Sequence, residues 1–281
     1  MKNLIKAIRS SADMSQERFA SALGTTPLSI NRWENGKARP NKMAQTQIYN
    51  FCKERDIDAA ALIQNIKADG NNDNRLILYH GSAKGIIGDI APISRKECDF
   101  GRGFYMSENT VDALTLVCNE ERPKLYTLEL DMSGLRVLTV DKGIDWALLI
   151  AYYRKEIEDA KGGGVYEKYA QMAEGYDLIV GYAANESIYT QLSRFFNKTL
   201  TDSALINCLN ALKPARQFAA VSEKACRQIK IIKEEELTQL ELLLLTDIGV
   251  RRRKAGIALA EEIELKYRRE GRFLDEILRG E

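Results

Sequence analysis

The chain contains a single histidine, His80, which ends the apolar run in "RLILYHGSAKG" and is followed by Gly81 and Ser82. An imidazole donates and accepts hydrogen bonds and changes its charge near neutral pH, so it can grip a ligand or move a proton. The five cysteines are scattered, and no two have CxxC spacing. We therefore expect reduced thiols and no metal centre. Taken alone, a single histidine after a strand is most often an ordinary surface or core residue.

A second stretch with chemical potential is "CDFGRGFYMSE", in which Tyr105 follows His80 by 25 residues. Gly101 and Gly103 would let the backbone come close to a flat or phosphorylated ligand. Phe104 and Tyr105 add aromatic rings, and the ring of Tyr105 could stack on such a ligand. Taken alone, a glycine turn followed by aromatic residues is common in ordinary cores, so this stretch gains meaning only together with His80.

The elements that must position these residues divide the chain into three segments. Residues 1–68 have a helical pattern, and the Gly, Asn and Asp-rich residues 69–75 predict a linker. Residues 76–233 mix strand and helix patterns, which predicts an α+β domain. Residues 234–281 have a helical pattern throughout. The expected protein is thus multidomain, with an all-α head, an α+β centre and a helical C-terminal segment.

Within the central segment, short β-type runs alternate with longer helical ones. The runs that predict strands are "LILYH", "KLYTLELD", "LRVLTV", "YDLIVGYA" and "RQFAAVS". Helices are predicted at "TVDALTLVC" and "DWALLIAYYRKEIEDA". "KGGG" at residues 161–164 predicts a surface loop or a helix stop.

Composition is that of an ordinary globular protein, with 281 residues of which 45% are hydrophobic and 29% charged. No apolar run is long enough to span a bilayer, and the N-terminus lacks a secretory signal pattern, so we expect a cytoplasmic protein with no membrane partner. Residues 1–70 carry 11 Lys and Arg against 7 Asp and Glu. This small positive surplus is compatible with binding a polyanion.

The head carries a strong local pattern in "MSQERFASALGTTPLSINRWENGKARPN". Ser15 is a capping residue before a first helix, and Gly24 provides the turn into a second helix of about residues 26–35. Gly36 and Pro40 then stop the chain from continuing as a helix. Phe19, Ala20, Leu23, Ile30 and Trp33 are expected to face inward. The pattern predicts a helix-turn-helix, and the whole stretch resembles the phage-repressor-like (XRE) family.

This resemblance implies that the second helix of the motif enters the major groove of DNA. Thr26, Leu28 and Arg32 would then face base edges, and Gln16 and Lys37 would face phosphates. Arg32 suits the paired acceptors of a guanine. Pro27 and Leu28 stand where the family often has polar residues, which favours weak base reading. The alternative is a head that binds only protein.

The central segment resembles the ADP-ribosyltransferase superfamily, in the branch that uses His, Tyr and Glu and includes diphtheria toxin and the poly(ADP-ribose) polymerases. The motifs "YHGS", "DFGRGFYMS", "WALLIAYYRK", "YDLIVGYAANESIY" and "ARQFAAVSEKACRQIKII" occur in order. Together they resemble a bacterial family within that superfamily, domain of unknown function 3990. The resemblance covers about residues 76–233 and implies two small packed sheets with NAD as substrate between them.

The resemblance also implies roles for individual residues. His80 would hold a ribose of NAD, Tyr105 would stack on nicotinamide, and Gln217 would hydrogen-bond a ribose hydroxyl, which makes these three the catalytic set. The further NAD-binding residues it implies are Gly81, Ser82, Gly101, Gly103, Phe104 and Asn185. Asp177 would order a strand start, and Arg154 would pair with a phosphate or an acid.

Gln217 stands where the superfamily branch usually has glutamate. An amide can bond a hydroxyl but cannot offer negative charge to an oxocarbenium-like transition state. Glu186 and Glu223 are the two acids that could supply this charge, although each is also expected as an ordinary surface or structural acid.

The C-terminal segment shows apolar positions at helical spacing and the basic run "RRRK" at residues 251–254. We expect this run to be a solvated helix face, with phosphate binding as the alternative.

The whole pattern predicts an NAD-dependent ADP-ribosyltransferase of toxin or defence type with a DNA-binding head and a macromolecular acceptor. An antitoxin protein and a second copy of the chain are further partners that this reading allows. The alternatives are a DNA-binding regulator that senses NAD or ADP-ribose without transfer, and an NAD hydrolase.

Overall fold

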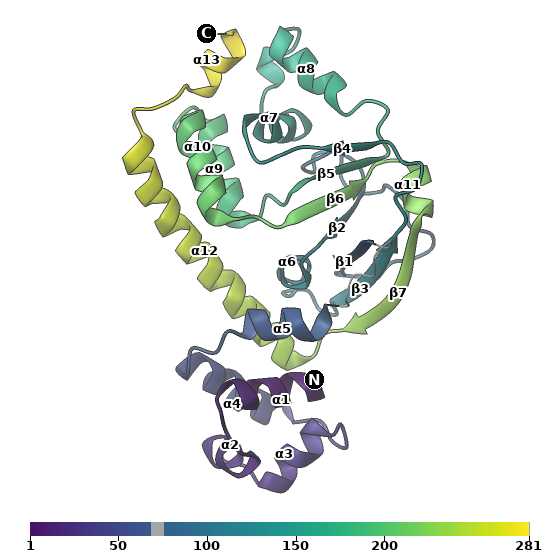
Figure 1. The fold of residues 1–281 in the computed structure, drawn as a ribbon, viewed down its shortest axis with the longest axis vertical. Helices are drawn as coiled ribbons and strands as arrows, with labels where there is room; N and C mark the ends of the chain where they lie inside the picture. Colours follow the sequence, from purple (N-terminus) through teal and green to yellow (C-terminus); the bar gives the residue numbers. More distant parts are fainter. Residues whose placement is uncertain (69–75, 281) are drawn as a thin grey trace.

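The computed structural model describes residues 1–68 and 76–280, apart from the side chain of Glu186. The predicted linker 69–75 lies outside the described residues. The head lies at one end of the molecule, a sheet and its covering helices form the rest, and one long helix runs along the side from the head towards the C-terminus (Figure 1).

The head consists of α1 (Lys2–Ser11), α2 (Gln16–Ala22), α3 (Pro27–Glu34), α4 (Lys42–Glu54) and α5 (Ala59–Lys67). Ser15 and Thr26 cap α2 and α3 by accepting backbone N–H bonds from Arg18 and Ser29. Gly24, with φ of +60°, makes the turn between these helices. The residues expected to face inward are all buried, so the predicted helix-turn-helix is confirmed.

The centre is built on one seven-stranded sheet. Its strands are β1 (Leu76–Ser82), β2 (Phe104–Ser107), β3 (Lys124–Leu130), β4 (Val137–Thr139), β5 (Leu178–Tyr182), β6 (Arg216–Ala220) and β7 (Ile229–Glu236), in the order β4-β5-β6-β2-β1-β3-β7. The β4–β5 pair is parallel, and the other pairs are antiparallel.

The α+β class is confirmed, but the expectation of two separate sheets needs correction. The two halves of the sheet are joined between β1 and β2, where the described residues pair only at Tyr79 and Ser107. Beyond this point, towards His80 and Gly81, the described residues of the two strands do not pair. The join is therefore narrow, and it leaves an opening between the halves beside the histidine.

The five predicted strands are present, and two more were not predicted. The strand β2 has only four residues, and β7 extends through Glu236, so the expectation of helix throughout residues 234–281 is wrong for its first residues. Helices follow from α12 (Gln239–Tyr267) to α13 (Leu274–Arg279).

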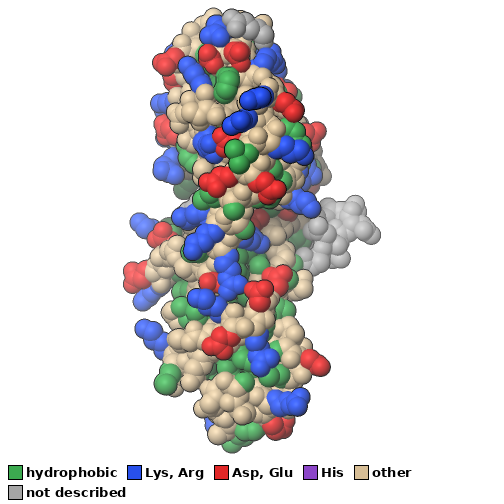
Figure 2. Space-filling view, turned by 90° about the vertical axis from the view of Figure 1, so that its left-hand side faces the viewer, with side chains coloured by type: hydrophobic (Ala, Val, Ile, Leu, Met, Phe, Trp, Pro, Cys, Tyr) green, Lys and Arg blue, Asp and Glu red, His purple; other side chains and the backbone are tan. Residues whose placement is uncertain are grey.

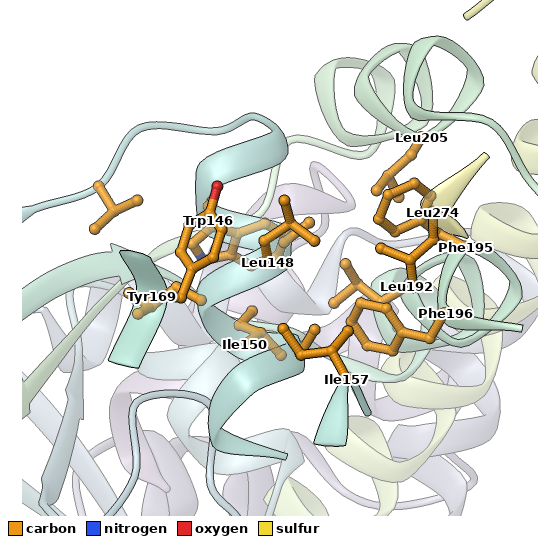
Figure 3. Close-up of a cluster of buried hydrophobic side chains, with 14 of the residues drawn as sticks. Trp146, Leu148, Ile150, Ile157, Tyr169, Leu192, Phe195, Phe196, Leu205 and Leu274 are labelled. Atoms are coloured by element: carbon orange, nitrogen blue, oxygen red, sulfur yellow. The ribbon is translucent and has the colours of Figure 1, made fainter. Parts of the chain in front are cut away.

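Helices cover the β4-β5-β6 half of the sheet. They are α7 (Ile144–Tyr153), the 3₁₀ turn η1 (Glu158–Ala160), α8 (Gly164–Met172), α9 (Glu186–Phe196) and α10 (Asp202–Leu212). Figure 3 shows part of their joint core, with Trp146 and Leu148 of α7 on one side and Leu192 and Phe195 of α9 on the other, and all four belong to one buried cluster. Because α7 is buried along most of its length, this half of the sheet has a fixed backing.

The head packs against the centre through α12 and through α6 (Thr110–Thr115). Gln45 of α4 accepts a bond of 2.8 Å from the backbone N–H of Leu240, and Gln64 of α5 accepts two bonds from Thr110. Buried apolar residues of the head form one cluster with residues of β1, α6 and α12. The head is thus held against the rest of the molecule by a shared core.

No helix in the described part of the chain combines the length and the apolar character needed to cross a bilayer.

Candidate active site

A pocket of about 560 Å³ lies beside the narrow join of the sheet, and we call it the central pocket. His80 of β1, Tyr105 of β2 and Gln217 of β6 all line it. The other walls come from the loop before β2, from α6, from the turn after β5 and from α12. The three residues expected to form the catalytic set therefore meet in one hollow of a size typical for ligand sites.

The imidazole of His80 is fixed by two neighbours. Its Nδ1 lies 2.7 Å from the carbonyl oxygen of Tyr105, and its ring stacks on Phe104 with centroids 4.5 Å apart. Since a carbonyl only accepts, Nδ1 carries the proton and Nε2 is left as an acceptor. Burial lowers the pKa of His80, against the opposing effect of the Tyr105 hydrogen bond. The side chain is thus a neutral, oriented hydrogen-bond acceptor at neutral pH.

Tyr105 is anchored through its hydroxyl. Its Oη donates to the carbonyl of Gly101 at 2.7 Å and accepts from the backbone N–H of Phe100 at 3.0 Å. Burial raises the pKa of Tyr105, so its hydroxyl stays protonated. With its hydroxyl held by the loop, the ring is a rigid apolar surface of the pocket.

Gln217 sits between two strands, where it pairs with Ser107 of β2 and Gly181 of β5. Its side-chain Oε1 is buried and has no hydrogen-bond partner among the described residues. A buried polar atom without a partner costs free energy unless a ligand or water completes it. This amide therefore fits a ligand that brings a hydroxyl or an N–H group into the pocket.

The glycines of the second motif serve packing. Gly101 has φ of +73°, and an added Cβ would lie 2.7 Å from the ring of Tyr153. An added Cβ on Gly103 would lie 3.1 Å from the carbonyl oxygen of Ala220. Neither residue lines the pocket, and their missing side chains make room for protein neighbours.

The other expected NAD-binding residues divide in the same way. Gly81 and Asn185 line the pocket, whereas Ser82 and Phe104 do not. Phe104 supports His80 from behind, and Asn185 caps α9 by accepting from the backbone N–H of Ile188 at 3.2 Å. Gly81 has no room for a side chain, because an added Cβ would collide with the carbonyl oxygen of Ala113 in α6. Its backbone is thereby held at the pocket wall.

Glu223, one of the two acids expected to help Gln217, does not line the pocket. Glu223 begins α11 (Glu223–Arg227), has a largely exposed side chain and pairs with Arg227 at 3.4 Å. It lies beyond the end of β6 that is opposite to Gln217, so it is a surface acid. Glu186 begins α9, and its side chain lies outside the described residues.

Two of the described carboxylates that line the pocket are each paired with an arginine. Asp99 accepts from Arg154 at 2.9 and 2.5 Å, which matches the expected acid pairing of Arg154. Asp112 accepts from Arg252 of α12 at 2.6 Å. Burial raises the pKa of both acids, and the neighbouring arginine lowers it in each case. Asp99 stands next to the glycine motif in the sequence, but nothing in the sequence marked Asp112.

The expected DNA-contacting residues lie on α2, α3 and the turn that follows. Thr26, Leu28, Arg32 and Lys37 are exposed, and Leu28 is 67% exposed. Gln16 is engaged within the head, because its Nε2 donates to Glu34 at 2.7 Å and its Oε1 accepts from Asn31 at 3.4 Å. A phosphate contact by Gln16 would have to coexist with these bonds.

Replacing Arg32 with alanine is expected to weaken binding to a preferred DNA sequence by about 1–3 kcal/mol and to relax specificity at one base pair. Lys37→Ala is the matched control. It is expected to weaken binding to all DNA sequences alike and to reduce the number of counterions released on binding by about one. Fluorescence anisotropy on oligonucleotides selected by the full-length protein measures both effects. If the Arg32→Ala protein prefers the selected DNA over random DNA as strongly as the unchanged protein does, Arg32 does not contact base edges.

Comparison with known proteins supports both parts of the chain. Residues 5–43 match a helix-turn-helix family, in agreement with the head described above. Residues 76–231 match the family described as a protein of unknown function, DUF3990. No curated protein and no solved structure gives a significant match to this chain. The match spans more than half of the residues and contains the strands that bear His80, Tyr105 and Gln217, so the chain belongs to the DUF3990 family, with a DNA-binding helix-turn-helix ahead of the family domain.

Proposed function

We propose that the chain is an NAD-dependent ADP-ribosyltransferase of toxin or defence type, which acts on a macromolecular acceptor and is directed by its DNA-binding head. The observation that carries this proposal is the convergence of His80, Tyr105 and Gln217 from three adjacent strands on one pocket. Their states also fit an NAD-type ligand, since the pocket offers a neutral imidazole acceptor, a fixed aromatic ring and an unpaired amide oxygen.

In this proposal, His80 Nε2 and Gln217 accept hydrogen bonds from ribose hydroxyls, and Tyr105 stacks on the nicotinamide ring. The acceptor forms a bond to the ribose carbon that carries nicotinamide, and it releases its proton. Nicotinamide leaves with the electron pair of the broken glycosidic bond. Water as the acceptor would give the hydrolase alternative.

The neutral side chain of Gln217 favours a second candidate, a regulator that binds NAD or ADP-ribose without transfer. Electrostatic stabilisation of developing positive charge is usually a large part of catalysis. In this pocket the described carboxylates are each neutralised by a cation: Asp99 by Arg154, Asp112 by Arg252 and Glu97 by Lys155. The two functions differ only in whether the glycosidic bond breaks.

The deciding experiment incubates the full-length protein with NAD labelled in the adenylate half, with cell extract and with DNA as acceptors. Label attached to protein or nucleic acid supports transfer, and label recovered as free ADP-ribose supports hydrolysis. Saturable binding with no nicotinamide release supports the regulator and overturns both enzymatic functions.

Tyr105→Ala is expected to lower the affinity for NAD by about tenfold or more, because stacking on an aromatic side chain contributes about 1–3 kcal/mol per base. Tyr105→Phe keeps the ring and loses only the hydroxyl bonds to Gly101 and Phe100, so it is expected to have a smaller effect. Equilibrium dialysis with labelled NAD compares the two variants. If phenylalanine proves as damaging as alanine, Tyr105 holds the loop and does not act by stacking.

A further inference from the structure

One wall of the central pocket comes from outside the family domain. The family match ends at residue 231, and α12 begins at Gln239. Yet Thr246, Val250 and Arg252 of this helix line the pocket. Figure 2 shows the face of the molecule that carries α12, where Lys and Arg side chains alternate with Asp and Glu side chains. The C-terminal helix therefore completes a site that the family domain alone leaves open on this side.

Two large apolar side chains of this wall are exposed to water. Leu116, which caps α6, is 69% exposed, and Val250 of α12 is 46% exposed, and both line the pocket. A single exposed leucine needs no explanation on a convex surface. Two exposed apolar residues within one pocket, from two packed helices, are what a flat apolar ligand group would cover.

A polar pair lies in the same wall. The hydroxyl of Thr246 donates to Oδ1 of Asn119 at 3.2 Å, and both residues line the pocket. This bond orients the amide, so that its Nδ2 remains a donor and Oδ1 keeps a second lone pair. An asparagine amide matches the adjacent donor and acceptor that adenine presents at N6 and N7.

We propose that this wall, made by Leu116, Asn119, Thr246 and Val250, is a subsite for the adenine base of the nucleotide. The inference rests on the proposed function, because it assigns the other half of NAD to the same pocket. The two parts are continuous, since α6 packs directly against β1 at Gly81, next to His80. The arginine of α12 that is held by Asp112 adds a cation to the wall between them.

The test uses isothermal titration calorimetry on the full-length protein with NAD, with AMP and with nicotinamide mononucleotide, which lacks the adenylate. Leu116→Asn is expected to weaken NAD and AMP binding by about tenfold and to leave nicotinamide mononucleotide unchanged. Leu265→Asn is the matched control, because Leu265 has the same exposed fraction of 69% but does not line the pocket. It is expected to change none of the three affinities.

A second variant tests recognition of the base. The unchanged protein is expected to bind NAD several times more tightly than its hypoxanthine analogue, in which a carbonyl replaces the N6 amino group. Asn119→Ala is expected to abolish this preference. An equal preference in both proteins would contradict the role of Asn119.

The outcomes separate the subsite from the proposed function. AMP binding that weakens in Leu116→Asn, in a protein that never releases nicotinamide, upholds the subsite and overturns transfer. NAD and AMP affinities that do not respond to Leu116→Asn overturn the subsite, whether or not NAD is consumed. If the protein binds none of the three nucleotides, both the subsite and the proposed function are overturned. If Leu116→Asn weakens the binding of all three equally, the substitution distorts the pocket in general, and the subsite is overturned.

Discussion

Replacing His80 with alanine is expected to lower the rate of nicotinamide release from NAD by about 10²–10³-fold, the usual loss when one preorganised hydrogen-bonding group is removed from a reacting centre. The reason is that His80 is held in one orientation by Tyr105 and Phe104, with Nε2 unprotonated. A preorganised acceptor needs no rearrangement when the ribose hydroxyl arrives. The rate is measured under saturating NAD, and the dissociation constant is measured separately.

His80→Asn is the sharper variant. Its amide can still donate to the Tyr105 carbonyl in place of Nδ1, but it has no group at the position of Nε2. If His80 only supports the strand of Tyr105, asparagine preserves the activity. If Nε2 contacts the substrate, asparagine is as damaging as alanine. Thermal unfolding of both variants controls for loss of the stacking on Phe104.

The same residue gives a pH profile. Burial lowers the pKa of His80 below its ordinary value, so the neutral imidazole persists as the pH falls through that value. Activity is therefore expected to stay level down to about pH 6.5 and to fall only at lower pH, as the imidazole becomes charged. Because the chain has a single histidine, an NMR titration of its ring reports this pKa without ambiguity. A ring that titrates above the ordinary value would contradict the neutral acceptor.

The helix-turn-helix could be predicted from the sequence because its signals are local. Ser15, Gly24, Thr26 and Gly36 mark the ends of α2 and α3 within a few residues, and the structure uses each of them as a cap or turn. His80, Tyr105 and Gln217 could be placed in one pocket only through ordered motifs. The numbers of residues that separate them in the sequence do not predict how close they lie in the fold.

The two strands that the sequence did not predict lacked a periodic signal. The edge strand β7 is exposed on most of its length and is rich in charges such as Lys233 and Glu234, as edge strands often are. Alternation of apolar and polar residues needs one buried face, and β7 has none. The strand β2 is too short to show a period.

The role of α12 could not be predicted because it depends on contacts between distant parts of the chain. Arg252 and its partner Asp112 are 140 residues apart. The basic run that was expected to be a solvated face is divided by the structure: Arg251 faces the head, where it binds Asp56, and Arg252 faces the pocket. Helical periodicity predicts which residues share a face of the helix. It does not predict which element packs against that face, because this depends on the tertiary fold.

Lys67→Met is expected to lower the free energy of unfolding by about 3–5 kcal/mol, the cost of leaving one partner of a buried ion pair alone. Lys67 of α5 binds Glu241 of α12 at 2.9 Å, and the two side chains are only 6% and 5% exposed. Burial alone would raise the pKa of Glu241, but the charge of Lys67 and the bonds from Thr238 outweigh it, and the pKa is lowered. Urea unfolding measures the change.

The matched control is Lys124→Met, which removes a partly exposed pair with Glu234 and is expected to cost far less, because exposed ion pairs add little to stability. Adding Glu241→Gln to Lys67→Met removes the lone charge and is expected to restore part of the loss. The sign of the pH dependence follows from the lowered pKa of Glu241: its contribution is present above the ordinary carboxyl pKa and is lost as the pH falls through the folded-state value. Lys67→Met should therefore cost less in acid. An equal cost at every pH would mean that the charge of Lys67 does not stabilise Glu241.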